Sequence, residues 1–354
     1  MKDSWENHKI ALALSGGGIR AMIFHLGVLR YLSEHRALES VDRISTVSGG
    51  SLLLGLIFKE CSYRWPSSNE LLAKAYPVLR EKLCTKSIQF GVIKQLFNPK
   101  NWSYLLSRAN ILAKTLHDEW GITAALSDLA KGPEWSINGT TAETGKRFRF
   151  KTDSLGDYML GYAPPGDFPL ADALAVSAAF PGGFGPLSLA TKNFVWQKRP
   201  KWDSPLDCIQ VTQSDYKRLH LYDGGVYDNL GLEPFFDAGR GAPKPYVDFI
   251  IVSDAGSPLV PFFSSFSLNP WRLKRVSDIM SDQSRALRVR TFMNYLGQDV
   301  TRGAYVYIGT QAAKKHYCPD GSQPANFPTT LRRVTKSEFD SIAGHGFAVA
   351  GALL

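Results

Sequence analysis

Short apolar runs and helical apolar spacing alternate along the first sixty residues. Residues 10–14 (IALAL) form a short apolar run that ends at glycines, which predicts a buried strand. From Ile19 to about His35, apolar residues recur at the spacing of a helix. Residues 44–47 (ISTV) predict a second short strand, and SLLLGLIF predicts the start of another helix. This order predicts an α/β fold, with a parallel sheet and crossover helices.

Residues 62–130 break the alternation, because their apolar pattern is largely helical. We interpret this segment as a helical insertion or cap within a single domain that spans residues 1–354. After it, strands are predicted at EWSINGTT (134–141), RFRFKTD (147–153), RLHLYDGG (218–225) and YVDFIIVSDAG (246–256). A small-residue helix is predicted to end at Pro181, and another helix covers residues 335–354.

A glycine-rich loop, LSGGGIR, follows the first predicted strand and admits three interpretations. It lacks the lysine pattern of a phosphate-binding P-loop. It matches the dinucleotide pattern G-x-G-x-x-A from Gly16 to Ala21, but the next strand runs into Ser48 rather than an acidic residue. The third interpretation is an oxyanion hole, in which Gly16, Gly17 and Gly18 let a substrate oxygen approach backbone N–H groups at a helix N-terminus.

Arg20 lies in the first turn of that helix and is grouped with the loop. Its side chain is expected to brace the loop or to neutralise a phosphate, the alternative being an ordinary surface arginine.

The candidate nucleophile is Ser48, in the sequence TVSGGS directly after the second predicted strand. This resembles the G-x-S-x-G nucleophile elbow, where small neighbours let strand and helix close on each other. Gly49 and Gly50 satisfy that need on one side, whereas Thr46 replaces the first glycine. Ser45 and Ser51 are rival hydroxyls, but neither is centred between small residues after the strand.

No histidine is singled out as the general base by its position. Asp223 is a stronger candidate, because it ends a predicted strand and is followed by two glycines. A carboxylate in such a buried turn can accept a serine proton when desolvation raises its pKa. A turn-forming aspartate is the competing interpretation. Asp254, in VSDAG, is the second candidate base, and Asp228 and Asn229 are expected to hold the Asp223 loop.

Composition narrows the class of protein without choosing a function. The 354 residues are 44% hydrophobic and 21% charged, as is usual for a globular protein. A formal net charge of +9 favours contact with anions of some kind. The four cysteines show no C-x-x-C pair, so we expect free thiols rather than a zinc site or disulfides. No signal peptide or membrane-spanning stretch is expected, which favours a cytoplasmic location.

Three motifs in order give the chain its resemblance to a known family. It resembles the patatin-like phospholipases, which carry a G-G-G-x-R oxyanion loop, a serine elbow and a D-G-G or D-G-A aspartate. Here these are Gly16 to Arg20, Ser48 with Gly49 and Gly50, and Asp223 with its two glycines. The resemblance also covers HLGVLRYL, SINGTTAETGKRFRF and ALAVSAAFPGGFGP. It implies a three-layer α/β fold, with a central, mostly parallel sheet flanked by helices.

The resemblance further implies a Ser–Asp dyad that hydrolyses lipid esters through an acyl-enzyme. Ser48 would attack the ester carbonyl, Asp223 would act as general base, and the glycine loop would hold the oxyanion. Neither a cofactor nor a metal is implied, and no acidic calcium-binding loop is found. The alternatives are a soluble ester or thioester hydrolase, and a non-enzymatic module that uses the glycine loop to sense a nucleotide or phosphate.

The expected partner is a phospholipid or another lipid ester. Aromatic and basic residues are interleaved in 261–290, which suggests peripheral contact with a membrane through that segment. Nucleic acid is not an expected partner, because no known binding fold accompanies the positive charge. A regulatory partner or activator remains open.

Overall fold

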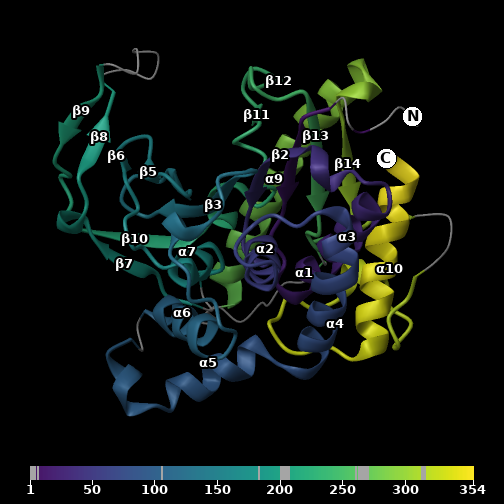
Figure 1. Ribbon diagram of the computed structural model, residues 1–354, viewed down its shortest axis with the longest axis horizontal. Helices are drawn as coiled ribbons and strands as arrows, with labels where there is room; N and C mark the ends of the chain where they lie inside the picture. Colours follow the sequence, from purple (N-terminus) through teal and green to yellow (C-terminus); the bar gives the residue numbers. More distant parts are fainter. Residues whose placement is uncertain are drawn as a thin grey trace.

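The computed structural model describes residues 5, 8–104, 107–181, 184–199, 208–259, 261, 271–311 and 316–354, with the backbone alone at 271–274 and 300. A mixed sheet, twelve strands in this described part, runs across the molecule (Figure 1). Five neighbouring strands are parallel, in the order β14 (Gly303–Tyr307), β13 (Phe249–Asp254), β1 (Ile10–Leu14), β2 (Val41–Thr46) and β3 (Glu134–Thr141).

The remaining strands extend the sheet beyond β3 in antiparallel fashion. They continue as β4 (Arg147–Phe150), β5 (Leu155–Asp157), β6 (Gly161–Ala163), β8 (Trp196–Lys198) and β9 (Gln210–Thr212). A branch also leaves β3 through β10 (Arg218–Asp223) to β7 (Leu187–Ala190). A separate hairpin joins β11 (Phe236–Asp237) to β12 (Ala242–Pro243).

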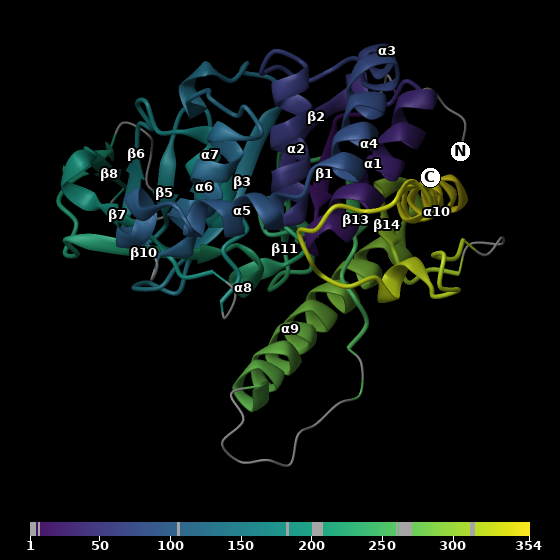
Figure 2. The ribbon, with the colours of Figure 1, turned by 90° about the horizontal axis from the view of Figure 1, so that it is seen from below.

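Helices cover both faces of the parallel strands, which gives the three layers (Figure 2). One face carries α1 (Gly18–Glu34), α2 (Gly49–Glu60), α7 (Leu170–Ser177) and α10 (Lys336–Leu353). The other carries α8 (Gly225–Asp228) and α9 (Trp271–Gln298). The predicted α/β class and the central, mostly parallel sheet flanked by helices are confirmed.

The residues of β1 show why the sheet is buried on both sides. Ile10, Leu12 and Leu14 point into the larger core, which α1, α2 and α10 complete. Ala11 and Ala13 point into a smaller core beneath α9, whose apolar residues Phe292, Tyr295 and Leu296 cover them. A continuous apolar run is typical of such a strand, because both of its faces are covered.

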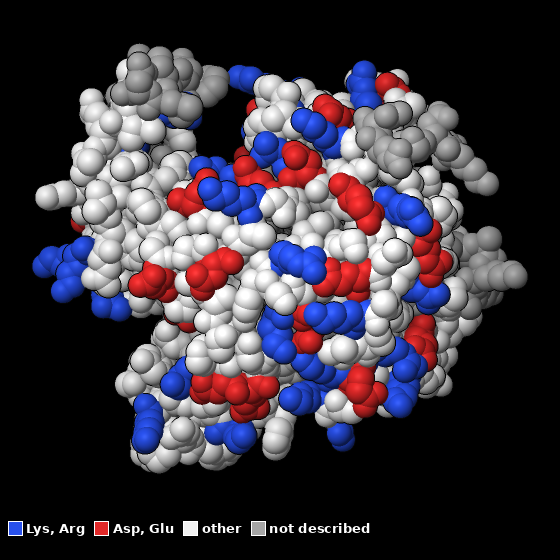
Figure 3. Space-filling model, in the orientation of Figure 1, with Lys and Arg blue, Asp and Glu red and all other residues white. Residues whose placement is uncertain are grey.

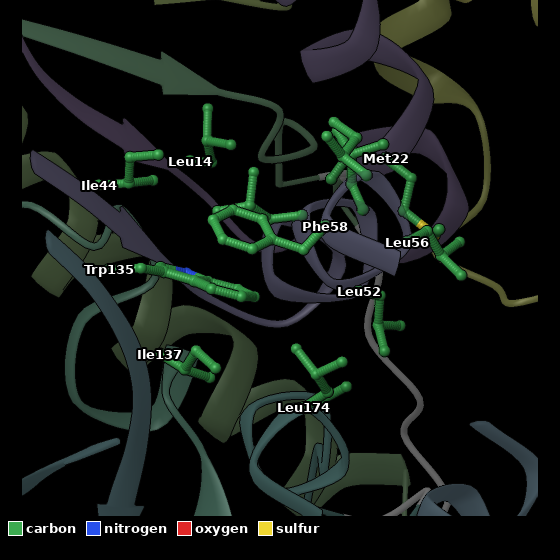
Figure 4. Close-up of a cluster of buried hydrophobic side chains, with 14 of the residues drawn as sticks. Leu14, Met22, Ile44, Leu52, Leu56, Phe58, Trp135, Ile137 and Leu174 are labelled. Carbon is green, nitrogen blue, oxygen red and sulfur yellow. The ribbon is translucent and has the colours of Figure 1, made fainter. Parts of the chain in front are cut away.

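The larger core is well filled around β2 and β3 (Figure 4). The Trp135 ring stacks on Phe58 with ring centroids 4.8 Å apart. Its indole N–H donates to the Thr46 hydroxyl at 2.9 Å, so this buried polar group is satisfied. This contact fixes the end of β2 immediately before the candidate nucleophile.

The 62–130 region contains several helices that pack into the main body. Its helices are α3 (Ser68–Glu70), the π-helix η3 (Leu71–Ala75), α4 (Tyr76–Thr85), α5 (Ile88–Leu96), η4 (Pro99–Tyr104), α6 (Arg108–Asp118) and η5 (Leu126–Asp128). Leu79, Leu83, Leu112 and Leu116 are fully buried in the larger core. A regulatory role for this insertion stays a prediction.

Short 3-10 helices complete the described elements. They are η2 (Leu38–Ser40), η6 (Thr191–Asn193), η8 (Val300–Arg302) and η9 (Pro324–Asn326). Among the helices that the structure describes, none combines the length and the apolar character needed to cross a bilayer.

The strand order creates a switch point between β1 and β13. The chain passes from β1 through α1 to β2 in one direction, and from β13 through α9 to β14 in the other. In open α/β sheets, ligands bind outside the carboxyl ends of the strands at such a point. Gly16, Ser48 and Ala255 all follow the carboxyl ends of these strands.

Candidate active site

Ser48 stands on a strained turn between β2 and α2. Its φ of 49° and ψ of −116° are unusual for a residue with a side chain, and such strain is found at functional sites. The two residues after it must be glycines, because a side chain at either position would not fit. A Cβ on Gly49 would lie 2.4 Å from the Gly18 carbonyl oxygen, and one on Gly50 would lie 2.6 Å from the Leu14 carbonyl oxygen. The turn therefore has the tight geometry of a nucleophile elbow.

The buried hydroxyl groups of Thr46, Ser51 and Ser177 hold this turn in place. The N–H of Ser48 donates to the carbonyl and hydroxyl oxygens of Ser177, at 3.1 and 3.0 Å. Ser51 donates its hydroxyl to Thr46 at 2.7 Å and is 2.8 Å from the Ser177 hydroxyl. Thr46, which departs from the glycine of the sequence pattern, thus links the end of β2 to α2 and to Trp135.

Asp223 ends β10 next to this turn and is only 2% exposed. Its backbone N–H donates to Ala179 at 3.1 Å, and its carbonyl accepts the Thr140 hydroxyl at 2.8 Å. One carboxylate oxygen accepts the Gly225 N–H at 2.7 Å. The Ser48 side chain lies near the same carboxyl group, close enough to lower its pKa. The two motifs, 175 positions apart, are therefore brought together.

Burial controls the acid–base behaviour of Asp223. Desolvation raises the pKa of this carboxyl to about 7, although the Gly225 N–H and the Ser48 side chain act in the opposite direction. A carboxylate with a pKa near neutrality is matched to general-base work at physiological pH. Ordinary turn-forming aspartates keep a low pKa, so the environment favours the catalytic interpretation of this D-G-G turn.

The glycine loop packs directly against the serine. The Gly16 N–H donates to the Asn229 carbonyl at 3.1 Å, and the Ile19 N–H donates to the Thr330 carbonyl at 2.8 Å. Among the described residues, no acceptor is bonded to the N–H groups of Gly17 and Gly18. These two N–H groups lie at the N-terminus of α1, a position suited to binding an oxyanion.

The N–H of Gly16 is already bonded, and the contribution of this glycine is to leave room for the side chains of Asn229 and Ser48. A Cβ at this position would lie 2.4 Å from the Asn229 side-chain oxygen and 3.1 Å from the Ser48 Cβ. Gly17 and Gly18 have φ values of 146° and 61°, which strongly favour glycine.

Arg20 braces the loop from inside the protein. Its side chain is buried, and Nε donates to the Ala255 carbonyl at 3.0 Å while another guanidinium nitrogen donates to the Phe327 carbonyl. Desolvation lowers the pKa of Arg20 to about 10, so it stays a cation at neutral pH. Both partners are protein carbonyls, and the loop-bracing alternative is therefore the one that the geometry favours.

The other candidate bases are occupied elsewhere. Asp254 is fully buried, and its carboxylate accepts hydrogen bonds from Arg285 at 2.6 Å and from the Tyr305 hydroxyl at 2.5 Å. A carboxylate paired with a guanidinium is a weak base. His25 is buried between the Ser253 hydroxyl and the Ser15 carbonyl, at 2.7 and 2.9 Å, and desolvation lowers its pKa to about 4.

All seven histidines lie in the described part of the chain, and no hydrogen bond joins any of them to Ser48 or Asp223. Nor do the described residues contain a group of three or more histidine, cysteine or acidic side chains able to hold a metal ion.

One residue of the site, Ser177, has no signal in the local sequence, whereas Asn229 and Asp228 were expected near Asp223. Ser177 was not singled out, because its role depends on the end of α7 meeting the elbow. Asn229 was expected to hold the Asp223 loop, and it does so through its carbonyl contact with Gly16. Asp228 also holds this loop, accepting the N–H groups of Leu230 and Glu233 at 3.1 and 2.9 Å.

A family model described as patatin-like phospholipase matches residues 12–236, which include the glycine loop, Ser48 and Asp223. The chain belongs to the patatin-like phospholipase family. This confirms the resemblance inferred from the three motifs. A comparison with curated proteins gives no match.

Solved structures show the same patatin-like architecture. Human GIVD cytosolic phospholipase A2 superposes with a TM-score of 0.59 at 14% identity, covering 98% of this chain and 62% of that protein. Its complex with methyl gamma-linolenyl fluorophosphonate gives a TM-score of 0.56 at 14% identity, covering 98% and 58%. At such identities the likeness supports the fold alone, and the chain spans less than two thirds of the human enzyme.

Proposed function

We propose that this patatin-like protein is a lipid acyl hydrolase of the phospholipase A or lysophospholipase type, with Ser48 as nucleophile and Asp223 as general base. The observation that carries the proposal is the strained Ser48 turn beside a buried carboxyl, that of Asp223, whose pKa is raised to about 7. Nucleophile and base within hydrogen-bond reach are what nucleophilic catalysis requires.

In the proposed reaction, the Ser48 oxygen bonds to the ester carbonyl carbon while its proton passes to Asp223. The carbonyl oxygen becomes an oxyanion, which the N–H groups of Gly17 and Gly18 stabilise. Collapse of this intermediate breaks the bond to the leaving alkoxide, which takes the proton back from Asp223. Water then attacks the acyl-enzyme with Asp223 again as base, and the fatty acid is released.

The alternative of a nucleotide- or phosphate-sensing module is less well supported. A phosphate cradle uses several unpaired N–H groups in succession. In this loop the N–H groups of Gly16 and Ile19 are already bonded to protein carbonyls. This leaves fewer unpaired N–H groups than a phosphate cradle uses.

The first test is fatty-acid release from mixed phospholipid vesicles, measured by mass spectrometry for the unaltered protein, Ser48→Ala and Asp223→Asn. We expect release by the unaltered protein alone. Equal release by all three proteins would remove the mechanism, whereas a soluble thioester or ester hydrolase would act on short-chain esters and leave vesicle lipids intact.

A second test uses a fluorophosphonate, because such reagents phosphonylate nucleophilic serines. One solved neighbour is in complex with a compound of this class, methyl gamma-linolenyl fluorophosphonate. Peptide mapping of the treated protein should find the adduct on Ser48 and on neither Ser45 nor Ser51. Labelling that persists in Ser48→Ala would contradict the assignment.

A further inference from the structure

The surface formed by α5 and η4, residues 88–104, is unusually apolar for a solvent-facing one. Phe90, Ile93 and Phe97 lie on one face of α5, at the spacing of neighbouring helical turns, and are 66%, 42% and 80% exposed. Trp102 on η4 is 59% exposed, and Tyr104 is 38% exposed. Single exposed apolar residues are normal, but a contiguous set of large ones marks an interaction site.

The stretch of sequence that carries this surface is basic. Residues 82–117 contain six lysines and arginines and no aspartate or glutamate. Of these, Lys86, Lys94 and Lys100 lie beside the exposed aromatics and are themselves exposed. In the lower part of Figure 3, basic side chains stand among uncharged ones and beside a group of acidic side chains. Such a combination of aromatics and cations suits the headgroup boundary of an anionic membrane.

A cleft of about 780 Å³ adjoins the same surface. Its walls include Lys86, Phe90, Trp120, Arg332 and Arg333. Glu119 also lines the cleft, where it is 3.6 Å from Lys94, and Arg332 is paired with Glu338 at 2.8 Å. Since Lys86 and Arg333 are exposed, the cleft offers cations to an anionic headgroup next to the Phe90 ring.

The α5–η4 surface is also attached to the active site at both of its ends. At one end, the Gln89 N–H donates to the Leu331 carbonyl at 2.9 Å. The neighbouring Thr330 carbonyl accepts the Ile19 N–H at 2.8 Å, behind the two free N–H groups of the glycine loop. Residues 324–335 therefore connect α5 to the oxyanion side of the site (Figure 1).

At the other end, the Ser107 hydroxyl donates to the Pro186 carbonyl. Seven positions earlier in the chain, the Ala179 carbonyl accepts the Asp223 N–H at 3.1 Å. Between these contacts, Phe180 is 43% exposed and continues the apolar character toward the dyad. The surface is thus tied to both sides of the active site, one through the glycine loop and one through Asp223.

We propose that the α5–η4 surface docks the protein onto an anionic phospholipid bilayer, with Phe90, Phe97 and Trp102 entering the headgroup boundary. This inference rests on the proposed function, because an enzyme acting on membrane lipids must bring its site to the lipid surface. The exposed cations Lys86, Lys100 and Arg333 favour an anionic lipid surface over the apolar groove of a partner protein. The docking surface differs from the 261–290 segment, whose aromatics Phe262, Phe263, Phe266 and Trp271 lie outside the described side chains.

The test measures binding of the full chain to vesicles of ether-linked phospholipids, which contain no carboxylic ester and cannot be turned over. Vesicles of phosphatidylcholine alone are compared with vesicles that also contain phosphatidylserine, by flotation at low and high salt. The surface variant is Phe97→Ala with Trp102→Ala. Its matched control is Tyr158→Ala with Val211→Ala, two residues that are 53% and 71% exposed on other elements.

We expect the surface variant to lose about tenfold or more in vesicle affinity, because two large apolar side chains no longer enter the boundary. The control should bind like the unaltered protein. Lys86→Gln with Lys100→Gln should reduce binding to the phosphatidylserine vesicles by about tenfold at low salt and by less at high salt. Circular dichroism and thermal unfolding verify that each variant is folded.

Two results would overturn the docking proposal: vesicle binding of the Phe97/Trp102 variant equal to that of the control, or no binding by the unaltered protein. In the latter case a protein partner would be the better occupant of this surface. Failure of the proposed function looks different, since it would leave binding to ether lipids intact while no fatty acid is released from ester lipids. If the surface variant still releases fatty acid and binds vesicles as the control does, the proposed function stands and the docking proposal is wrong.

Discussion

Ser177 accepts the backbone N–H of Ser48 with both its carbonyl oxygen, at 3.1 Å, and its hydroxyl oxygen, at 3.0 Å. This paired contact holds the strained turn in place from the end of α7. It also removes the Ser48 N–H from the set of donors available to a substrate. Ser177 is therefore a positioning residue, acting through the nucleophile's backbone.

Ser177→Ala should lower kcat by about tenfold with little change in KM, because the Ser48 oxygen is aimed less well while substrate binding is untouched. The unfolding free energy should fall by about 1–2 kcal/mol, since Ser51 loses a hydrogen-bond partner. The control is Ser33→Ala, which removes another buried hydroxyl, bonded to the Leu29 carbonyl at 2.8 Å. It should cost similar stability and leave kcat unchanged; a parallel fall in kcat would refute positioning.

The raised pKa of Asp223 predicts a pH dependence of activity. A general base must be deprotonated, so kcat/KM should rise about tenfold per pH unit below the pKa and level off above about 7. The profile is measured with a water-soluble ester, because a vesicle surface has its own titration. A midpoint near that of an ordinary aspartate would contradict the desolvated dyad.

The same raised pKa has a consequence for stability. The folded protein holds the Asp223 proton more tightly than the unfolded chain does, so this contribution to stability is present at low pH and is lost between about pH 4 and 7. Asp223→Asn carries no such penalty. Its unfolding free energy relative to the unaltered protein should rise by about 2–4 kcal/mol between pH 4 and 8. Urea unfolding at both pH values measures the difference, and a constant offset would argue against a buried ionisation.

The lack of space behind the glycine loop predicts that Gly18→Ala disturbs the site. The added Cβ would lie 2.5 Å from the Thr330 carbonyl oxygen, at a φ of 61° that disfavours side chains. The loop must shift, so activity should fall by about 10²–10³-fold. Gly145→Ala is the matched control, because its φ of 64° is similar but nothing lies within 4 Å of the new Cβ. It should lose about 1 kcal/mol of stability and keep its activity; equal losses of activity would refute the argument.

Local signals predicted the parallel half of the fold well. Apolar runs ended by glycines marked β1 and β2, and helical spacing marked α1 and α10, because each of these elements is decided by its own residues. The antiparallel extension from β4 to β9 was harder to predict. Most of its strands are only three residues long, so pairing with neighbours decides them more than their own pattern does.

The α9 helix was missed for a related reason. Residues 261–299 mix aromatic, polar and basic residues, and the helix shows no clear apolar face. Phe292, Tyr295 and Leu296 near its C-terminal end do pack under the sheet, but only three-dimensional contact reveals this. In the site, the three motifs could be predicted because each is a short, continuous stretch of sequence. Ser177 and the buried partners of Arg20 and Asp254 could not, because they depend on contacts between segments far apart in the chain.

The buried pair of Asp254 and Arg285 gives a last prediction, which separates the two candidate bases. Arg285 nitrogens lie 2.6 and 2.8 Å from the same carboxylate oxygen, and the pair ties α9 to the end of β13. Asp254→Asn removes the nearer counter-charge of a guanidinium that is 14% exposed and leaves it Asp282 at 3.8 Å, so the unfolding free energy should fall by about 3–5 kcal/mol. The fraction that stays folded should keep the kcat/KM midpoint near 7, because that midpoint belongs to Asp223. A shifted or absent midpoint in this variant would instead make Asp254 part of the catalytic machinery.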